Sequence, residues 1–210
     1  MSTEAKQSRR FLTWVQFDGT SFCGYQRQPD RRTVAGDFEQ AWKRWRGEVI
    51  HAQSSSRTDS GVHARRMPIS FKTTQRVPSQ AVMHGMNHEL AFDMAIQSCE
   101  QVGHDFHVRH DAIGKRYVYR LWNGRVRSPL RRINHWQVSR TLDIDLMAEA
   151  APALVGSHAF DAFRSVHCQS RTTRRAMRHV SAERDGDLVT ITIEGNAFLH
   201  NMVRVMVGTL

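Results

Sequence analysis

Hydrophobic and polar residues alternate along several short segments of this chain, and turn-forming residues bound most of these segments. Alternation with a period of two is typical of strands that bury one face. The strands predicted from such segments and from short apolar runs span residues 11–17, 48–54, 69–71, 94–99, 115–122, 180–182 and 188–193. Asn123-Gly124 ends the clearest strand, and Asp185-Gly186 joins the last two as a hairpin. Pro68 is expected at the first position of its strand.

Four other segments show the three- and four-residue spacing of apolar residues that is typical of an amphipathic helix. The helices predicted in this way span residues 34–46, 78–84, 144–155 and 198–210. Thr33 and Asp143 can cap the first and third helices, and Gly47 and Gly156 can end them. Pro152 is expected to interrupt the third helix near its end.

Strands, helices and hairpins occur in both halves of the chain, without the regular strand–helix alternation of a parallel sheet. The pattern therefore predicts the α+β class, with two subdomains of antiparallel sheet flanked by helices. We expect a flexible basic tail at residues 1–10, an N-terminal subdomain at 11–104 and a C-terminal subdomain at 105–210. The last helical pattern stops abruptly, so we expect the natural protein to continue beyond Leu210.

The composition is that of a folded globular protein, with 40% hydrophobic and 24% charged residues among 210. Three cysteines at distant positions argue against a disulfide framework and against a zinc knuckle. No run of 18 apolar residues and no signal-peptide pattern occurs, so we expect a cytoplasmic protein without a membrane partner.

Basic residues outnumber acidic ones by 30 to 20, which gives a formal net charge of +10. Such a charge attracts polyanions, and the planar guanidinium group of arginine suits phosphate. Charge alone leaves open whether this surface is merely solvated or binds nucleic acid. The arginines form three clusters, namely Arg65-Arg66, Arg125-Arg127-Arg131-Arg132 and Arg171-Arg174-Arg175-Arg178.

The polar segment at residues 55–64 contains Asp59, and this carboxylate is the leading candidate for chemistry. Asp59-Ser60-Gly61 matches the triplet of aspartic proteases, but a monomeric protease needs this triplet twice and it occurs once. A metal site is a second possibility, because His104, His107 and His110 recur at intervals of three. No established ligand pattern surrounds these histidines.

A third possibility is that Asp59 acts as a nucleophile on a nucleotide that has been flipped out of its stack. Arg57 could then occupy the space that the extruded nucleotide leaves. Such a site requires an aromatic side chain that stacks on the base and a cation that keeps the carboxylate ionised. Tyr117 and Arg204 could fill these two roles if the fold brings them near Asp59.

The sequence Arg-Thr-Asp-Ser-Gly-Val-His-Ala at residues 57–64 resembles the catalytic motif of the tRNA pseudouridine synthase A family. Further segments resemble that family in the same order along the chain. They are residues 18–28, 105–109 with 115–119, 160–172 and 196–208. Ser56 departs from the pattern, because the family usually has glycine at this position.

The resemblance implies a cofactor-free and metal-free enzyme that isomerises uridine to pseudouridine in the anticodon stem-loop of tRNA, at nucleotides 38 to 40. It also implies a homodimer with the pseudouridine synthase fold, whose two α+β domains form a basic RNA-binding cleft. Two alternatives remain open. The chain could be a non-catalytic RNA-binding homologue, or it could carry out the same reaction on another RNA.

Carried over by position, the resemblance makes Asp59 the nucleophile and Arg57 the residue that helps to expel the nucleotide. Tyr117 becomes the residue that stacks on the base, and Arg204 becomes the ion-pair partner of Asp59. A further set of arginines is expected to contact the RNA. They are Arg27, Arg65, Arg66, Arg109, Arg116, Arg171, Arg174 and Arg175.

Overall fold

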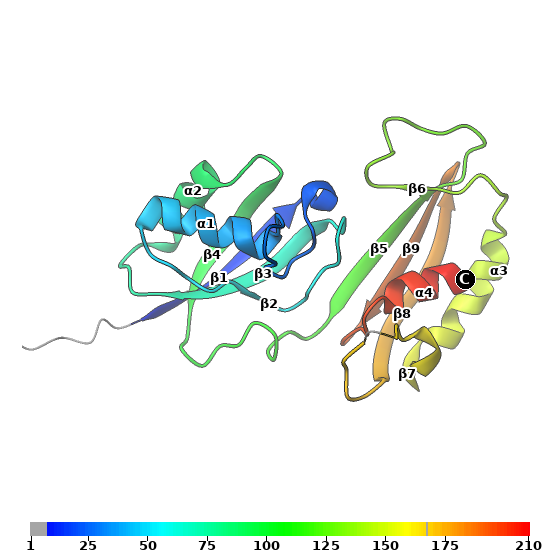
Figure 1. Cartoon of the computed structure of the whole chain (residues 1–210). Coiled ribbons are helices and arrows are strands. Elements are labelled where there is room, and N and C mark those ends of the chain that lie inside the picture. Colours follow the sequence, from blue (N-terminus) through cyan, green and yellow to red (C-terminus); the bar gives the residue numbers. More distant parts are fainter. Residues whose placement is uncertain (1–7, 167) are drawn as a thin grey trace, which may run out of the picture. The chain divides into compact units, whose positions relative to one another are not determined.

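The computed structural model describes residues 8–166 and 168–210, which form two compact units that divide between Ala112 and Ile113. Each unit contains one sheet and helices that cover it (Figure 1). This arrangement confirms the predicted α+β class. The expected tail at residues 1–10 lies mostly outside the described residues, and Arg9 and Arg10 already belong to the first strand.

The first unit has a four-stranded antiparallel sheet in the order β2-β3-β1-β4. Its strands are β1 (Arg9–Phe17), β2 (Gln53–Ser54), β3 (Ala64–Thr73) and β4 (Met94–Val102). Its helices are the short 3-10 helix η1 (Gly19–Ser21), α1 (Val34–Arg46) and α2 (Ser79–Glu89). The α-helices cover one face of the sheet, and the core of this unit lies between them (Figure 1).

Helix α1 begins and ends where the sequence predicts. The side chain of Thr33 accepts a hydrogen bond from the Gly36 N–H, and Gly47 ends the helix with a φ of 69°. The apolar face of α1 packs on the sheet through Phe38 and Trp42, whose rings lie 5.6 and 4.8 Å from that of Phe71. Both side chains are fully buried, so truncating either to alanine would cost about 3 to 5 kcal/mol.

Strand β3 is longer than predicted, and the expected position of Pro68 is wrong. Pro68 lies in the middle of β3, where it pairs with Trp14 of β1. Strand β2 pairs with Ser70 and Ile69, so among the described residues no strand flanks β3 on that side at Pro68. A proline is tolerated at such an edge, because no neighbouring strand requires its missing N–H.

The second unit has a five-stranded sheet in the order β6-β5-β9-β8-β7, in which only the pairing of β5 with β6 is parallel. Its strands are β5 (Lys115–Trp122), β6 (Trp136–Gln137), β7 (Gly156–Ala159), β8 (Arg174–Asp185) and β9 (Leu188–Gly195). Its helices are α3 (Ile144–Ala150), η2 (Ala151–Leu154), η3 (Asp161–Phe163) and α4 (Met202–Thr209).

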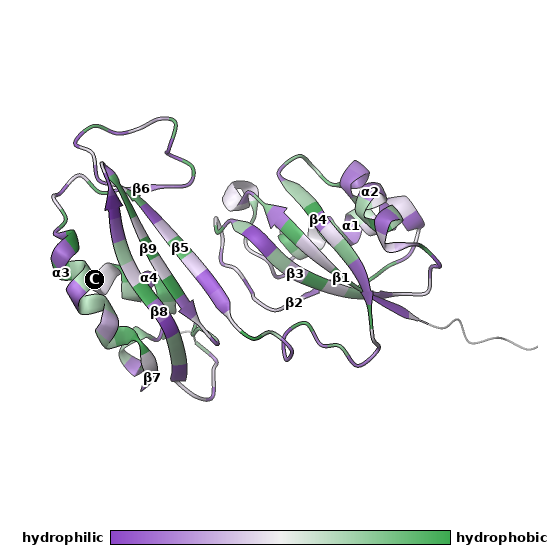
Figure 2. Cartoon of the chain, turned by 180° about the vertical axis from the view of Figure 1, so that it is seen from behind, coloured by the Kyte–Doolittle hydropathy of each residue, from purple (hydrophilic) through white to green (hydrophobic). Residues whose placement is uncertain are grey.

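Alternation decides which face of the second sheet is buried. In β9, Val189, Ile191 and Ile193 are buried and the residues between them are half-buried. The buried face packs against α3 and α4, and Figure 2 shows hydrophobic and hydrophilic bands along the strands. The predicted strand at residues 115–122 and the hairpin at Asp185-Gly186 are both confirmed.

Two predicted helices are shorter than expected. Helix α3 ends at Ala150 and continues as the 3-10 helix η2, which has Pro152 in its first turn. A proline cannot donate the α-helical hydrogen bond, so the α-helix ends before it. Helix α4 begins at Met202 and not at Phe198, because Asn201 adopts a left-handed conformation with a φ of 61°.

In the part of the chain that the structure describes, no helix combines the length and the apolar character that crossing a membrane requires.

Candidate active site

The segment that carries Asp59 is a loop between β2 and β3. Gly61 has a φ of 77°, and the Val62 N–H donates to the Asp59 carbonyl oxygen at 3.2 Å, which closes a turn directly after the carboxylate. Asp59 is half-buried and Arg57 is exposed. The loop therefore fixes the backbone at Asp59 while the guanidinium group of Arg57 extends into solvent.

A second loop, at residues 18–28, holds the Asp59 loop in place. The Tyr25 N–H donates to the Thr58 carbonyl oxygen at 3.0 Å, next to Asp59. On the other side of Asp59, the Gly61 N–H and the Ser60 hydroxyl both donate to the Phe22 carbonyl oxygen at 3.3 Å. The backbone of Asp59 is thus bracketed by hydrogen bonds from a separate part of the chain.

Two glycines allow this close approach. A Cβ atom at Gly24 would lie 2.7 Å from the Thr58 carbonyl oxygen, and Gly24 also has a φ of 86°. A Cβ atom at Gly19 would lie 2.1 Å from the Val62 carbonyl oxygen. Neither separation can be accommodated without moving the backbone, so both positions require glycine.

Tyr25 and Glu39 hold the chain just before the loop. The buried Tyr25 hydroxyl donates to the Ala52 carbonyl oxygen at 3.0 Å, and the Ala52 N–H donates to a Glu39 carboxylate oxygen at 2.9 Å. Burial, followed by the charge of Glu39, raises the pKa of Tyr25, so the hydroxyl keeps its proton and remains a donor. Sequence reasoning did not identify these two residues, because their partner, Ala52, is distant along the chain.

Asp18 and His63 link the two loops at a second point. The His63 Nδ1 atom lies 3.1 Å from the Gly19 nitrogen and 3.0 Å from an Asp18 oxygen. An unprotonated Nδ1 accepts from the Gly19 N–H, whereas a protonated Nδ1 donates to Asp18. Hydrogen bonds from Thr20, helped by His63, lower the pKa of Asp18, so this carboxylate stays ionised.

Arg32 lies between the second loop and α1, and it contacts residues of both. Its guanidinium group donates to both carboxylate oxygens of Asp93, at 2.6 and 2.8 Å, and also pairs with Asp37. It stacks over the Phe22 ring at 4.2 Å. The hydrogen bonds to Asp93 raise the pKa of Arg32, so it remains charged.

Tyr117 and Arg204 belong to the second unit. Tyr117 lies in β5, and its half-buried ring meets that of Phe198 edge to face, with 5.0 Å between the centroids. This contact places Tyr117 on the face of the sheet that carries α4. Arg204 is an exposed residue of α4 itself. The structure thus places Arg57 and Asp59 in one loop of the first unit, and Tyr117 and Arg204 on one face of the second.

Five of the eight expected RNA-binding arginines contact other groups of the protein, and four of these five are exposed as well. Arg116 donates to Glu194 at 2.8 Å, and this hydrogen bond lowers the pKa of Glu194. Arg175 donates to the Ser170 hydroxyl at 2.7 Å. Contacts with the protein also involve Arg27 with Glu39, Arg66 over the Trp14 ring and Arg174 with the Ser157 carbonyl oxygen. The side chains of Arg65, Arg109 and Arg171 are exposed.

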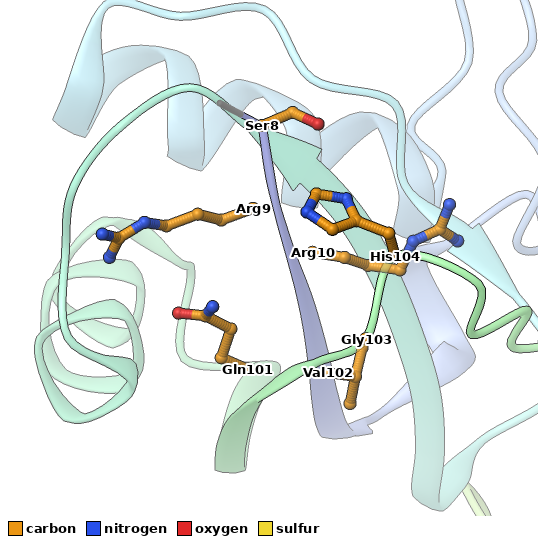
Figure 3. Close-up of a pocket in the computed structure, with 7 residues that line it drawn as sticks. All are labelled: Ser8, Arg9, Arg10, Gln101, Val102, Gly103 and His104. Atoms are coloured by element: carbon orange, nitrogen blue, oxygen red, sulfur yellow. The ribbon is translucent and has the colours of Figure 1, made fainter. Parts of the chain in front are cut away.

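The cavity in Figure 3 lies away from the Asp59 loop. It has a volume of about 430 Å³ and is lined by residues from one end of β1 and β4, including Arg9, Arg10 and His104. Arg9 and Arg10 extend to opposite sides of β1, and Arg10 donates to the Phe106 carbonyl oxygen at 2.6 Å. Within the described residues, no three histidine, cysteine, aspartate or glutamate side chains are arranged to hold a metal ion.

The chain combines an α+β architecture with an Arg-Thr-Asp loop that a second, glycine-containing loop braces. Its sequence is similar to one family of enzymes. A family model described as tRNA pseudouridine synthase matches residues 14–111 and 150–210. The chain belongs to this family, and its members are isomerases that act on uridine in tRNA.

Individual relatives carry the same description over most of the chain. The tRNA pseudouridine synthase A of Geotalea daltonii is 43% identical over 93% of this chain and 80% of its own length. The enzyme of the same name from Pelobacter propionicus is also 43% identical, with the same coverage of both chains. That of Herminiimonas arsenicoxydans is 40% identical over 100% of this chain and 78% of its own length.

Proposed function

We propose that this protein converts uridine to pseudouridine in the anticodon stem-loop of tRNA, at nucleotides 38 to 40, with Asp59 as the nucleophile. The observation that carries the proposal is the Asp59 loop, whose backbone is bracketed by hydrogen bonds to Phe22 and Tyr25. A nucleophile must be held in a productive position relative to its target, and a loop braced in this way supplies that rigidity.

The reaction rearranges the atoms of one nucleotide. The bond between N1 of uracil and C1′ of ribose breaks, and a bond between C5 and C1′ forms. C5 loses a proton and N1 gains one, so the product has the same composition and oxidation state as the substrate. No cofactor is therefore required by this chemistry. The nucleophile allows the N1–C1′ bond to break so that the base can rotate before it rejoins.

Three further residues complete the proposed site. Arg57, exposed two positions before Asp59, enters the space of the extruded nucleotide. Tyr117 stacks on the base, and its half-buried ring is supported from one side by Phe198. Arg204 pairs with Asp59 and keeps the carboxylate ionised, as an opposite charge does. The homodimer that the family resemblance implies is part of the same proposal.

The test is to incubate purified protein with unmodified tRNA and to map pseudouridine at single-nucleotide resolution. We expect modification at nucleotides 38 to 40 with the wild type and none with Asp59→Ala. Modification elsewhere would overturn the proposed position and leave the nucleophile standing, whereas equal activity of the two proteins would overturn the nucleophile.

The alternative to a pseudouridine synthase is an RNA-binding protein that lacks catalytic activity. Ser56 departs from the usual family motif, and its N–H donates to the Ser54 hydroxyl at 3.3 Å, which shapes the entry to the Asp59 loop. Such a protein would bind tRNA with a steep salt dependence but form no pseudouridine at any protein concentration. Comparing pseudouridine in RNA from cells with and without this gene would also reveal a different RNA substrate.

A further inference from the structure

The segment between β5 and α3, residues 123–142, is strongly basic and takes no part in the proposed active site. It contains no aspartate or glutamate, and it carries Arg125, Arg127, Arg131, Arg132 and Arg140. These five residues equal half of the formal net charge of +10 on the chain. The segment also falls between the two stretches that match the family model, residues 14–111 and 150–210. We call residues 123–142 the arginine segment.

The arginines of this segment are available to a partner. Arg125, Arg127, Arg132 and Arg140 are exposed, whereas Arg131 is half-buried and stacks on the Trp122 ring at 5.0 Å. The positive charge of nearby arginines also affects His135, as the second cause after burial. Burial, followed by the charges of Arg131 and Arg120, lowers the pKa of His135.

Exposed apolar side chains accompany these charges. Leu130 is 98% exposed, Val126 is 77% exposed and Trp136 is 52% exposed. Trp136 meets Tyr119 of β5 edge to face, with 6.3 Å between the ring centroids, so one part of the indole is supported and the rest faces solvent. Supported aromatic rings beside arginines are what single-stranded or splayed nucleotides stack on.

The arginine segment is anchored to the end of the sheet. The Asn123 side chain donates to the carbonyl oxygens of Val138 and Arg140, at 2.8 and 2.7 Å. The Trp122 indole N–H donates to the Val126 carbonyl oxygen at 2.9 Å. These bonds tie both ends of the segment to β5. Binding of a ligand therefore costs the segment less conformational entropy than it would cost an untethered loop.

The segment and Tyr117 lie at opposite ends of β5. Tyr117 pairs with Ile193 of β9, and Trp122, at the other end of the strand, pairs with Leu188. The two residues are five positions apart along the strand, which corresponds to about 17 Å. An RNA whose target base stacks on Tyr117 must therefore extend well beyond that nucleotide before it reaches the arginine segment.

We propose that the arginine segment binds the phosphate backbone of the tRNA substrate away from the nucleotide that is modified. The inference rests on tRNA being the substrate, but it does not depend on which uridine reacts. A second copy of this chain is the other candidate partner. The charge disfavours it, because each copy carries a net charge of +10 and the segment offers no acidic side chain to a basic neighbour.

The test compares two triple variants with equal loss of charge. The first is Arg125→Gln, Arg127→Gln and Arg132→Gln, which spares Arg131 because its side chain packs on Trp122. The control is Lys43→Gln, Lys72→Gln and Arg76→Gln, which removes three exposed cations of the first unit. For each protein, the Kd for unmodified tRNA is measured over a range of KCl concentrations, and the single-turnover rate is measured at saturating tRNA.

We expect the first triple variant to bind tRNA more weakly and to lose about 2 to 3 units from the slope of log K against log salt, at roughly 0.7 to 0.9 per phosphate contact. Its single-turnover rate should equal that of the wild type, which also shows that it is folded. The control should bind and react like the wild type.

Three results would overturn the proposal. The slope could be unchanged in the first triple variant, or both triple variants could lose the same slope, which would indicate a general charge effect. The first variant could instead change the oligomeric state with its tRNA affinity intact, which would identify a protein interface. Asp59→Ala measured in parallel separates these results from a failure of the proposed function, because it removes the reaction and leaves binding in place.

Discussion

Tyr25 contacts the Asp59 loop itself and also the chain just before it. Its N–H donates to the Thr58 carbonyl oxygen and its hydroxyl to that of Ala52, each at 3.0 Å. The buried side chain of Tyr25 thus fixes the chain just before the loop, and its backbone N–H fixes the chain next to Asp59. Tyr25 is a positioning residue in this account, because its two hydrogen bonds go to the backbone of the loop and of the chain just before it.

Tyr25→Phe should slow the reaction without weakening tRNA binding. The substitution leaves the Ala52 carbonyl oxygen without its donor, which costs about 1 to 3 kcal/mol of unfolding free energy. A small displacement of Asp59 should reduce the single-turnover rate about 10- to 100-fold. Rapid-quench assays with tRNA and thermal unfolding measure the two effects.

Thr13→Val is the matched control for that variant. Thr13 is fully buried in the same unit, and its hydroxyl donates to the Ile69 carbonyl oxygen at 2.9 Å. Its loss should lower the unfolding temperature by a similar amount and leave the rate unchanged. If both variants slow the reaction equally, Tyr25 acts only through overall stability.

Among the elements, the end of α1 and the end of β3 are joined by Glu48. Its carboxylate accepts hydrogen bonds from the Trp42 indole at 3.0 Å and from the Thr74 N–H and hydroxyl at 2.9 and 2.8 Å, and it also accepts one from the Thr73 hydroxyl. Burial opposes ionisation of Glu48, but these donors prevail, and its pKa is lowered.

Glu48→Gln should destabilise the protein by about 1 to 3 kcal/mol at neutral pH, because an amide oxygen is a weaker acceptor for these donors. The pKa of Glu48 is lower in the folded state than in the unfolded state. Its contribution is therefore complete above the ordinary glutamate pKa of about 4.3 and is lost as the pH falls through the lower folded value. Urea unfolding at a series of pH values should show the two proteins converging in acid. A constant difference would show that the Glu48 charge does not matter.

Local signals in the sequence predicted several elements correctly. Thr33 and Gly47 mark the ends of α1, because a capping side chain and a left-handed glycine can be recognised from a few adjacent residues. The four residues of β7 could not be predicted, since their strand conformation depends on pairing with β8. The start of α4 was predicted too early, because the apolar spacing continues back to Phe198 and does not reveal the positive φ of Asn201.

In the candidate site, too, some residues could be predicted from the sequence and others could not. The motif around Asp59 is contiguous, so the sequence alone could identify it. The roles of Tyr25 and Glu39 depend on hydrogen bonds to Ala52 from residues far from it in sequence, and only the fold reveals them.

At the scale of the whole molecule, the net charge of +10 should make tRNA binding strongly salt-dependent. Part of that charge is compensated within the protein. Glu194 lies 2.8 Å from Arg116 and 3.6 Å from Arg178, so one carboxylate restrains two arginines on β5 and β8.

Glu194→Gln should strengthen tRNA binding at low salt, because it frees Arg116 for a phosphate group. The slope of log K against log salt should become steeper by up to about 1. Glu149→Gln removes an equal charge from an exposed position on α3 and serves as the control. Equal effects of both variants would mean that Arg116 makes no specific contact with the RNA.

The role of Asp59 as the nucleophile is tested most directly by the single-turnover rate of pseudouridine formation with Asp59→Asn, measured together with its affinity for tRNA. Asparagine preserves the size of the side chain but cannot act as the nucleophile. We expect the variant to bind unmodified tRNA like the wild type and to form no pseudouridine. Pseudouridine formation at the wild-type rate by Asp59→Asn would contradict this role of Asp59.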